Sequence, residues 1–257
     1  MDTSTAYKIK TYNAIAPVGL QRFDSGDYTV GPELEGADAM LLRSHKLSVE
    51  ELTPGLRAIA RAGAGVNNVP VDACSQAGIV VFNTPGANAN SVKELVLTGL
   101  LLASRDVIGG VNYVRSLADV SDDAELNKLV EAEKKKFKGR ELIGKTLGVV
   151  GLGAIGSMVA RAALDLGMDV LGYDPALSVD AAWRLPSSVE RMDNLPSLFA
   201  RADYVTLHVP QLPATEGMIN AEALQAFKPG SVLLNFARQP IVDAAALKAS
   251  LESGHLG

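Results

Sequence analysis

Three glycines in the second half of the chain have the spacing of a phosphate-binding turn. The segment Gly151-Leu-Gly-Ala-Ile-Gly156 directly follows the apolar run Thr146–Val150. In a strand–turn–helix unit, Gly151 would permit the tight turn, Gly153 would let the backbone approach a pyrophosphate, and Gly156 would allow the helix to pack closely on the strand. The N–H groups of Ala154 and Ile155 would then lie at a helix N-terminus, where phosphate oxygens bind. The motif predicts a dinucleotide site.

A carboxylate follows the next predicted strand. Asp174 directly follows the segment Met168–Tyr173. Its distance from Gly156 in the sequence is close to the spacing of about 20 residues that is typical of this fold. There it would accept hydrogen bonds from the adenosine ribose and repel a 2′-phosphate, so NAD is favoured over NADP. The alternative is a glycine-rich turn without a ligand, but strand, turn, helix and acidic residue together favour a cofactor site.

An arginine follows another predicted strand. It is Arg238, in the segment Asn235-Phe-Ala-Arg-Gln-Pro-Ile-Val-Asp243. A guanidinium fork can engage both oxygens of a carboxylate at once, which suits a 2-oxo acid. The alternative is a surface arginine in an ion pair.

The segment Leu207-His208-Val209-Pro210 ends a further strand. Its loop should face the same crevice, because ligands of open α/β sheets bind at the carboxyl ends of the strands. His208 is a candidate base, but no carboxylate is placed in the sequence to orient it, so a loop-positioning role is favoured. Pro210 would stiffen the loop, and Thr215 could hydrogen-bond the cofactor.

Short β-rich runs alternate with helical patterns along the whole chain, which indicates an α/β fold with parallel sheets. The predicted strands are Tyr7–Tyr12, Ala39–Arg43, Leu56–Ala60, Ile79–Asn83, Thr146–Gly151, Met168–Tyr173, Tyr204–His208 and Ser231–Phe236. Helices are expected at Val71–Ala77, from Asn90–Ser91 through Leu101, and at Asp243–Ser253, with Gly78 and Gly254 as C-terminal stops. A charged stretch, Asp119–Arg140, should be an exposed helix and loop. We expect two domains, 1–93 and 94–257.

Composition excludes several classes of protein. The chain has 257 residues, of which 47% are hydrophobic and 21% charged, so disorder is not expected. A net charge of −5 does not suggest nucleic-acid binding. Cys74 is the single cysteine, and the apolar stretch Leu95–Ala103 is far short of the ~20 residues that span a bilayer. We expect a cytoplasmic protein with no metal site.

The second half resembles the D-2-hydroxyacid dehydrogenases through two motifs, Gly-Leu-Gly-x-Ile-Gly and Asn-x-x-Arg-x-x-x-Val-Asp. The resemblance implies NAD as cofactor and two doubly wound parallel-sheet domains, a flavodoxin-like substrate domain and a Rossmann domain. It implies that Arg238 is catalytic, binding the substrate carboxylate and polarising the carbonyl. It also implies cofactor contacts from Val209, Phe236, Ala237 and Ala64. One departure is Gln239, where the family commonly has glycine.

The first half is similar to the branch of this family that oxidises 3-phospho-D-glycerate. Its matching segments are Leu42-Arg43-Ser44, Arg61–Val69 and Phe82–Asn88. The resemblance implies substrate contacts from Arg43, Ser44, Gly63, Ala64, Gly65 and Asn88. The chemistry agrees, because a phosphate suits arginine and hydroxyl donors and a carboxylate fits a nest of N–H groups. The basic run Lys134–Lys138 is expected to be a solvated loop rather than part of the phosphate site.

The resemblance further implies a glutamate and a histidine that move the proton, both downstream of the helix that ends near Ser253. His45, His208 and His255 match neither position, so we expect a truncated sequence whose second domain is incomplete at its C-terminus. The implied reaction is oxidation of 3-phospho-D-glycerate to 3-phosphohydroxypyruvate, the first step of serine biosynthesis. The alternatives are a glycerate- or lactate-type dehydrogenase and a non-catalytic NAD-binding sensor. A homodimer through the NAD-binding domain is also implied, using the helix from Ser91 and the segment Asp119–Lys138.

Overall fold

The computed structural model describes residues 6–183 and 185–257, and the chain divides into two compact units. Unit 1 is Met1–Asn88 and unit 2 is Ala89–Gly257. The sequence analysis placed its boundary between residues 93 and 94, which lies inside helix α3 (Ala89–Ser104). Within the described residues, no helix is both long enough and apolar enough to cross a membrane.

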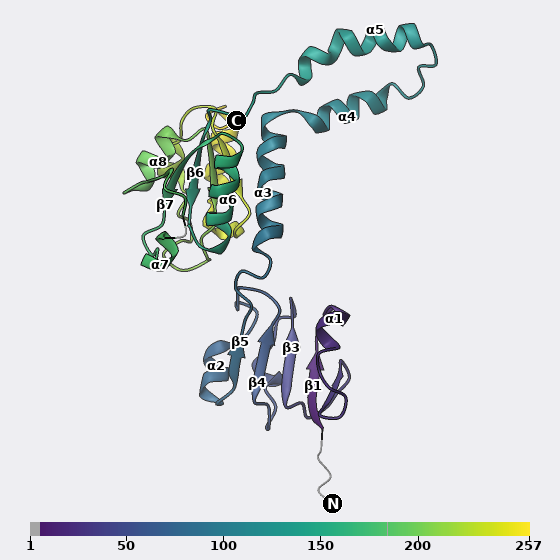
Figure 1. Cartoon of the computed structure of the whole chain (residues 1–257), viewed down its shortest axis with the longest axis vertical. Helices are drawn as coiled ribbons and strands as arrows, with labels where there is room; N and C mark the ends of the chain where they lie inside the picture. Colours follow the sequence, from purple (N-terminus) through teal and green to yellow (C-terminus); the bar gives the residue numbers. More distant parts are fainter. Residues whose placement is uncertain (1–5, 184) are drawn as a thin grey trace, which may run out of the picture. The chain divides into compact units, whose positions relative to one another are not determined.

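Unit 1 is built on a five-stranded parallel sheet with the order β2-β1-β3-β4-β5 (Figure 1). Its strands are β1 (Tyr7–Thr11), β2 (Tyr28–Gly31), β3 (Ala39–Leu42), β4 (Ala58–Arg61) and β5 (Val80–Phe82). Its helices are α1 (Pro17–Leu20), the 3₁₀ turn η1 (Val49–Glu51) and α2 (Val71–Gln76). The chain builds outward from β1 to β2 on one side and then to β3 on the other, so the topological switch point lies between β1 and β3. This is the flavodoxin-like strand order.

Unit 2 has a second five-stranded parallel sheet, with the order β10-β9-β6-β7-β8. Its strands are β6 (Thr146–Val150), β7 (Asp169–Tyr173), β8 (Val189–Arg191), β9 (Tyr204–Leu207) and β10 (Val232–Asn235). Beside the sheet are α6 (Ala154–Asp165), α7 (Val179–Ala182), α8 (Leu195–Arg201), α9 (Ala221–Gln225), the 3₁₀ turn η3 (Gln239–Ile241) and α10 (Ala244–Glu252). The strand order reverses between β6 and β9, as in the Rossmann fold. Both predicted sheet architectures are confirmed.

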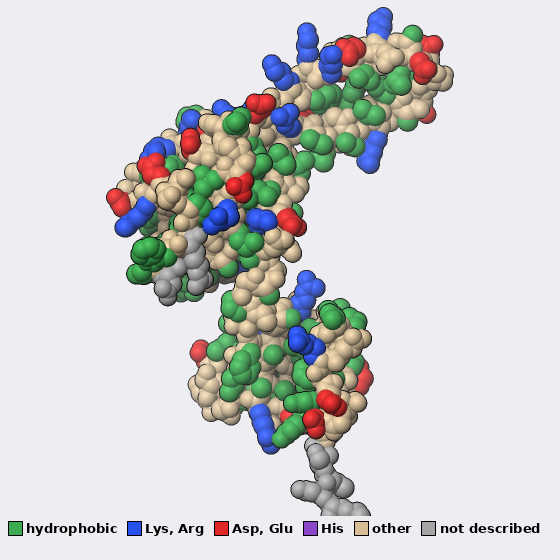
Figure 2. Space-filling view, in the orientation of Figure 1, with side chains coloured by type: hydrophobic (Ala, Val, Ile, Leu, Met, Phe, Trp, Pro, Cys, Tyr) green, Lys and Arg blue, Asp and Glu red, His purple; other side chains and the backbone are tan. Residues whose placement is uncertain are grey.

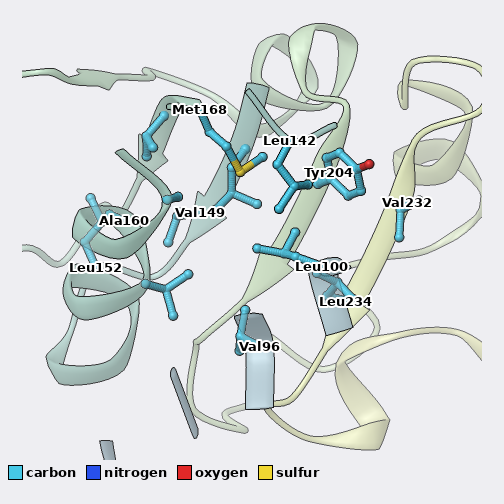
Figure 3. Close-up of a cluster of buried hydrophobic side chains, with 14 residues drawn as sticks. Val96, Leu100, Leu142, Val149, Leu152, Ala160, Met168, Tyr204, Val232 and Leu234 are labelled. Atoms are coloured by element: carbon cyan, nitrogen blue, oxygen red, sulfur yellow. The ribbon is translucent and has the colours of Figure 1, made fainter. Parts of the chain in front are cut away.

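The core of unit 2 has two hydrophobic clusters. In Figure 3, Val96 and Leu100 of α3 lie beside Leu234 of β10, and Tyr204 of β9 lies beside Leu142. The hydroxyl of Tyr204 is 2.8 Å from that of buried Ser104, which ties α3 to the sheet. The second cluster includes α8 and the stacked rings of Phe199 and Phe227. Burial of β6 between these clusters holds its carboxyl end in a fixed place.

A helical hairpin leaves the end of α3. It consists of α4 (Val107–Ser116) and α5 (Asp123–Glu133), followed by the 3₁₀ turn η2 (Lys134–Phe137), and the two helices run side by side (Figure 1). The hydroxyl of Tyr113 donates to the carbonyl of Leu129, and its ring lies 5.6 Å from that of Phe137. Both helices begin at a capping aspartate, so local sequence defines the hairpin.

The predicted elements agree with the structure except at short or edge segments. The C-terminal stops are confirmed, since Gly78 and Gly254 both have φ of 73°. Strands β2 and β8 were not predicted, because an edge strand has one unpaired side and needs no continuous apolar run. Helix α4 was also missed, and α3 begins at Ala89 rather than at the predicted cap.

Candidate cofactor and substrate sites

Two of the three glycines of the phosphate-binding turn are required by close backbone approach. Gly151 has φ of 92°, and a Cβ there would lie 2.8 Å from the carbonyl oxygen of His208. A Cβ on Gly156 would lie 1.8 Å from the carbonyl oxygen of Gly151. Around Gly153, by contrast, no heavy atom lies within 4 Å of such a Cβ. The turn is therefore tight on the protein side and open over Gly153.

Helix α6, which this turn opens, begins at Gly153 without a side-chain cap. Several other helices of unit 2 do have a side-chain cap. The capping residues are Asp106 for α4, Asp122 for α5, Asn194 for α8, Asn220 for α9 and Asp243 for α10. The N–H groups at the start of α6, from Ala154 and Ile155, are thus left for a ligand. An uncapped N-terminus below an open glycine fits the diphosphate of a dinucleotide.

Asp174 joins the end of β7 to this turn. Its Oδ2 accepts from the N–H of Leu152 at 2.9 Å, and its Oδ1 accepts from the N–H of Ala176 at 3.0 Å. Each carboxylate oxygen has two acceptor positions, so both retain capacity for a ribose hydroxyl. The half-buried negative charge disfavours a phosphate at the same place.

His208 follows β9 and lies against the glycine turn, since its N–H donates to the carbonyl of Val150 at 2.7 Å. Its Nε2 is 3.0 Å from Oγ1 of Thr206. Burial lowers the pKa of His208 to about 4, so the ring is neutral at physiological pH. This arrangement suits a positioning residue and not a proton acceptor.

The loop after His208 is closed by its own contacts. Oγ1 of Thr215 donates to the carbonyl of Pro210 at 2.6 Å and accepts from the N–H of Leu212 at 2.9 Å. A hydroxyl has a single proton, and that of Thr215 is already donated to Pro210. In this conformation Thr215 therefore stabilises the loop and has no proton left to donate to a cofactor. Half-buried Val209 packs beside Gly151, with Cγ1 3.1 Å from the position of a Cβ there.

The loop after β10 carries Arg238 at the same edge of the sheet. Asn235 organises it: its Nδ2 donates to the carbonyl of Arg238 at 3.0 Å, and its Oδ1 accepts from the N–H of Ala237 at 3.1 Å. Arg238 is exposed, and Nη1 donates to the carbonyl of Ala237 at 2.7 Å. Among the ion pairs formed by the described residues, none includes Arg238. The loop borders a cavity of about 460 Å³, so the guanidinium is accessible to a ligand.

Phe236, predicted as a cofactor contact, has its ring turned toward α3. Its ring packs on α3, where a Cβ on Gly99 would lie 3.1 Å from Cζ. A side chain held this way serves the core, which leaves its backbone for any contact with the cofactor.

In unit 1, the turn after β3 presents Arg43 and Ser44, both exposed. The next residue, His45, is engaged: Nε2 lies 2.9 Å from Oε1 of Glu51, and its ring stacks on Tyr12 with 4.2 Å between centroids. Burial and the Glu51 carboxylate raise the pKa of Tyr12 to about 12. Burial alone would raise the pKa of Glu51, but hydrogen bonds from the Ser48 N–H, His45 and Tyr12 outweigh it and hold that pKa low. Glu51 therefore keeps its negative charge beneath the turn.

The glycine-rich loop after β4 lies at the same edge of the sheet. The N–H of Gly63 donates to the carbonyl of Arg61 at 2.9 Å, so in this conformation it is occupied. Nδ2 of Asn83 donates to the carbonyl of Ala64 at 2.7 Å and fixes the loop next to β5. Ala64 is exposed and Gly65 half-buried, so their N–H groups remain candidates for a carboxylate. Asn88 is exposed at the end of unit 1.

The sequence analysis missed two asparagines that hold the Arg43–His45 turn. Asn13 accepts from two of its N–H groups, and Asn68 donates to two of its carbonyls. For Asn13 the available signal was an asparagine directly after the predicted strand Tyr7–Tyr12, because this residue tolerates a left-handed backbone and bonds to nearby main chain. Within the described residues, no group of three or more His, Cys, Asp or Glu side chains is arranged to hold a metal ion.

Residues 110–257 match the family described as D-isomer specific 2-hydroxyacid dehydrogenase, NAD binding domain. The chain belongs to this 2-hydroxyacid dehydrogenase family. Unit 2 is accordingly an NAD-binding domain, in agreement with the uncapped helix and the open turn described above.

The relatives that the chain resembles are named for different substrates. The chain is 40% identical over 223 residues to D-3-phosphoglycerate dehydrogenase of Mycobacterium leprae, covering 86% of the chain and 39% of the relative. It is 41% identical over 226 residues to (S)-sulfolactate dehydrogenase of Chromohalobacter salexigens, covering 86% and 68%. The structure of D-lactate dehydrogenase from Aquifex aeolicus, complexed with NAD and lactic acid, has a TM-score of 0.74 at 27% identity, covering 97% of this chain and 74% of that one.

Proposed function

We propose that the protein oxidises 3-phospho-D-glycerate to 3-phosphohydroxypyruvate with NAD, as part of serine biosynthesis. The observation that carries the dehydrogenase assignment is Arg238, exposed and outside every ion pair of the described residues, at the same sheet edge as the Gly151–Gly156 turn. A guanidinium that forms no ion pair within the described residues is available for the carboxylate of a 2-hydroxy acid.

The residues have separate roles in this proposal. NAD, when bound, accepts the hydride from the carbon that carries the hydroxyl group. The N-terminus of α6 holds the diphosphate, and Asp174 holds the adenosine ribose. Arg238 binds the carboxylate and stabilises the negative charge that grows on the carbonyl oxygen. His208, Val209 and Pro210 shape the wall of the cofactor site.

The three histidines are each engaged elsewhere, so we do not assign any of them as the proton acceptor. His45 bonds to Glu51, and half-buried His208 lies beside Thr206 with a lowered pKa. Nε2 of His255 lies 3.1 Å from the carbonyl oxygen of Leu224. A general base needs a lone pair directed at the substrate and a pKa near the working pH.

The phosphate is assigned to Arg43 and Ser44. Phosphoglycerate and sulfolactate, the substrates named for two relatives, both have a second anionic group, which is a phosphate in one and a sulfonate in the other. An exposed arginine and a hydroxyl at the switch point of the unit 1 sheet suit either anion. Lactate, the ligand of the Aquifex aeolicus structure, lacks such a group, so the choice of substrate tests this assignment.

Arg43→Ala should raise the KM for 3-phospho-D-glycerate by roughly 100-fold and leave the NADH affinity unchanged, because it removes a charge-assisted contact to one substrate group. Initial rates of NADH formation, measured on the full-length protein, provide the test. Arg57→Ala is the matched control: Arg57 is an exposed arginine of the same unit, before β4 and thus at the opposite edge of the sheet. An unchanged KM in Arg43→Ala, or turnover of D-lactate or D-glycerate in preference to phosphoglycerate, would refute the substrate assignment.

Asp174→Ala should weaken NADH binding by roughly 10-fold and reduce discrimination against NADPH, because the ribose acceptor and the charge that repels a 2′-phosphate are both lost. Fluorescence titration with each reduced cofactor measures the two dissociation constants. Asp193→Ala, an exposed aspartate of the same unit, should change neither. A variant that still rejects NADPH as strongly as the wild type would show that Asp174 is not at the ribose.

We also propose a homodimer formed through the NAD-binding domain, by α3 and the α4–α5 hairpin. Hydrophobic side chains are exposed along this hairpin in Figure 2. On α4 they are Val107, Ile108, Val111 and Val114, and on α3 they are Leu95, Leu101 and Leu102. Contiguous exposed apolar surface on a soluble domain is typical of an association site.

The double variant Val111→Asp/Val114→Asp should dissociate the dimer, because two charges would be buried in an apolar interface. Sedimentation velocity at micromolar concentration measures the change in mass. Val18→Asp, at a still more exposed valine of unit 1, is the control. A wild-type protein that sediments as a monomer would contradict the proposed interface.

A further inference from the structure

The switch point of the unit 1 sheet is flanked by the loops that follow β1 and β3. In open α/β sheets this is the place where ligands bind, because the chain leaves neighbouring strands in opposite directions and opens a crevice. Asn13 follows β1, and the Arg43–His45 turn follows β3. The two loops are thus neighbours at the point where topology alone predicts a ligand.

Asn13 connects these loops with two hydrogen bonds. Its Oδ1 accepts from the N–H of Ser44 at 2.9 Å and from the N–H of His45 at 2.7 Å. Asn13 has φ of 63°, and no other non-glycine residue in the described part of the chain has a positive φ. A left-handed backbone at a non-glycine residue is unfavourable and persists where surrounding contacts enforce it, often at functional sites.

The carbonyl groups of the same turn are held from other loops. Nδ2 of Asn68 donates to the carbonyl of His45 at 2.7 Å and to that of Arg43 at 3.3 Å. Nε of Arg61 donates to the carbonyl of Arg43 at 3.1 Å. Because its Ser44 and His45 N–H groups are occupied, this turn does not offer them as a nest for an anion. An anion bound here is recognised by the side chains of Arg43 and Ser44.

We infer that Asn13 is a positioning residue that sets the Arg43–Ser44 turn in the shape required to bind the second anionic group of the substrate. The inference rests on the proposed function, since that proposal assigns the anion to Arg43 and Ser44. Asn13 itself makes no contact with the anion in this role. It removes the need to order the turn when the substrate binds, which is how preorganisation increases affinity.

The experiment uses Asn13→Gly in the full-length protein. Glycine adopts positive φ without strain, so this variant removes the carboxamide and keeps the backbone shape accessible. The KM for 3-phospho-D-glycerate should rise roughly 10-fold, as expected for the loss of two hydrogen bonds that preorganise a site. The KM or inhibition constant of D-glycerate, which lacks the phosphate, should stay unchanged, as should the NADH affinity. Amide hydrogen exchange of residues 43–45 should become faster.

Asp24→Gly is the matched control. Asp24 also uses a side-chain oxygen to order a turn in unit 1, accepting from the N–H of Gly26 at 2.8 Å, but this turn precedes β2 and lies at the opposite edge. A merely structural role of Asn13 would change the constants for 3-phospho-D-glycerate and D-glycerate equally. This result, or no change in either constant, would overturn the inference. If Arg43→Ala leaves the KM for phosphoglycerate unchanged, the proposed substrate fails and the inference fails with it. An effect of Arg43→Ala without an effect of Asn13→Gly overturns the inference alone.

Discussion

Gly156→Ala should destabilise the NAD-binding domain by at least about 2 kcal/mol and abolish NADH binding, because its new methyl group has no space. The Cβ would lie 1.8 Å from the carbonyl oxygen of Gly151, which is backbone and cannot rotate away. To relieve this clash, α6 must move away from β6. The N-terminus of α6 would then no longer be aligned with Asp174. Urea unfolding followed by circular dichroism, together with NADH fluorescence, measures both effects.

Gly153→Ala provides the control in the same turn. Gly153 has φ of −66° and no heavy atom within 4 Å of a Cβ, so alanine should change the free energy of unfolding by no more than about 1 kcal/mol, the size of an N-cap effect. NADH affinity should nevertheless fall about 10-fold or more, because the methyl group would occupy the space where the diphosphate approaches the backbone. Full affinity in Gly153→Ala would show that the diphosphate does not pass over this residue. An unchanged urea midpoint in Gly156→Ala would contradict the close helix–strand contact.

The sequence could predict the features that depend on short-range pattern. The glycine turn, the parallel sheets and the helix stops at Gly78 and Gly254 are indicated by residues close together in the sequence. All of them are present in the structure. Strand β2 escaped prediction because an edge strand is stabilised by pairing along one side, here with β1, and its sequence Tyr-Thr-Val-Gly has no marked pattern.

The Asn13 contacts could not be predicted for a different reason. Asn13 and its partners Ser44 and His45 are about thirty positions apart in the chain, and the register of β1 with β3 decides that they meet. Phe236 is the converse case. It was assigned to the cofactor from its place in a motif, and its ring packs on Gly99 of α3. A motif specifies which backbone approaches a ligand, whereas the direction of each side chain depends on the tertiary contacts around it.

Arg238→Ala should lower kcat/KM by about 10²–10³-fold with NADH affinity unchanged, because the variant removes a donor that acts on the charge developing in the transition state. The hydrogen bond from Nη1 of its side chain to the carbonyl of Ala237 is exposed, so the free energy of unfolding should hardly change. Arg238→Lys retains the charge and loses the two-pronged fork, so we expect a rate between those of the alanine variant and the wild type.

Arg191→Ala is the control for Arg238, because Arg191 is an exposed arginine of the same domain whose only described ion pair, 3.7 Å to Asp193, contributes little. Steady-state kinetics on the full-length protein separate the two outcomes that matter. A fall in kcat/KM that is specific to Arg238 supports a guanidinium bound to the reacting acid. A loss of NADH affinity in parallel with the loss of rate would instead mean that Arg238 orders the cofactor site, and the assignment of Arg238 to the substrate carboxylate would have to be abandoned.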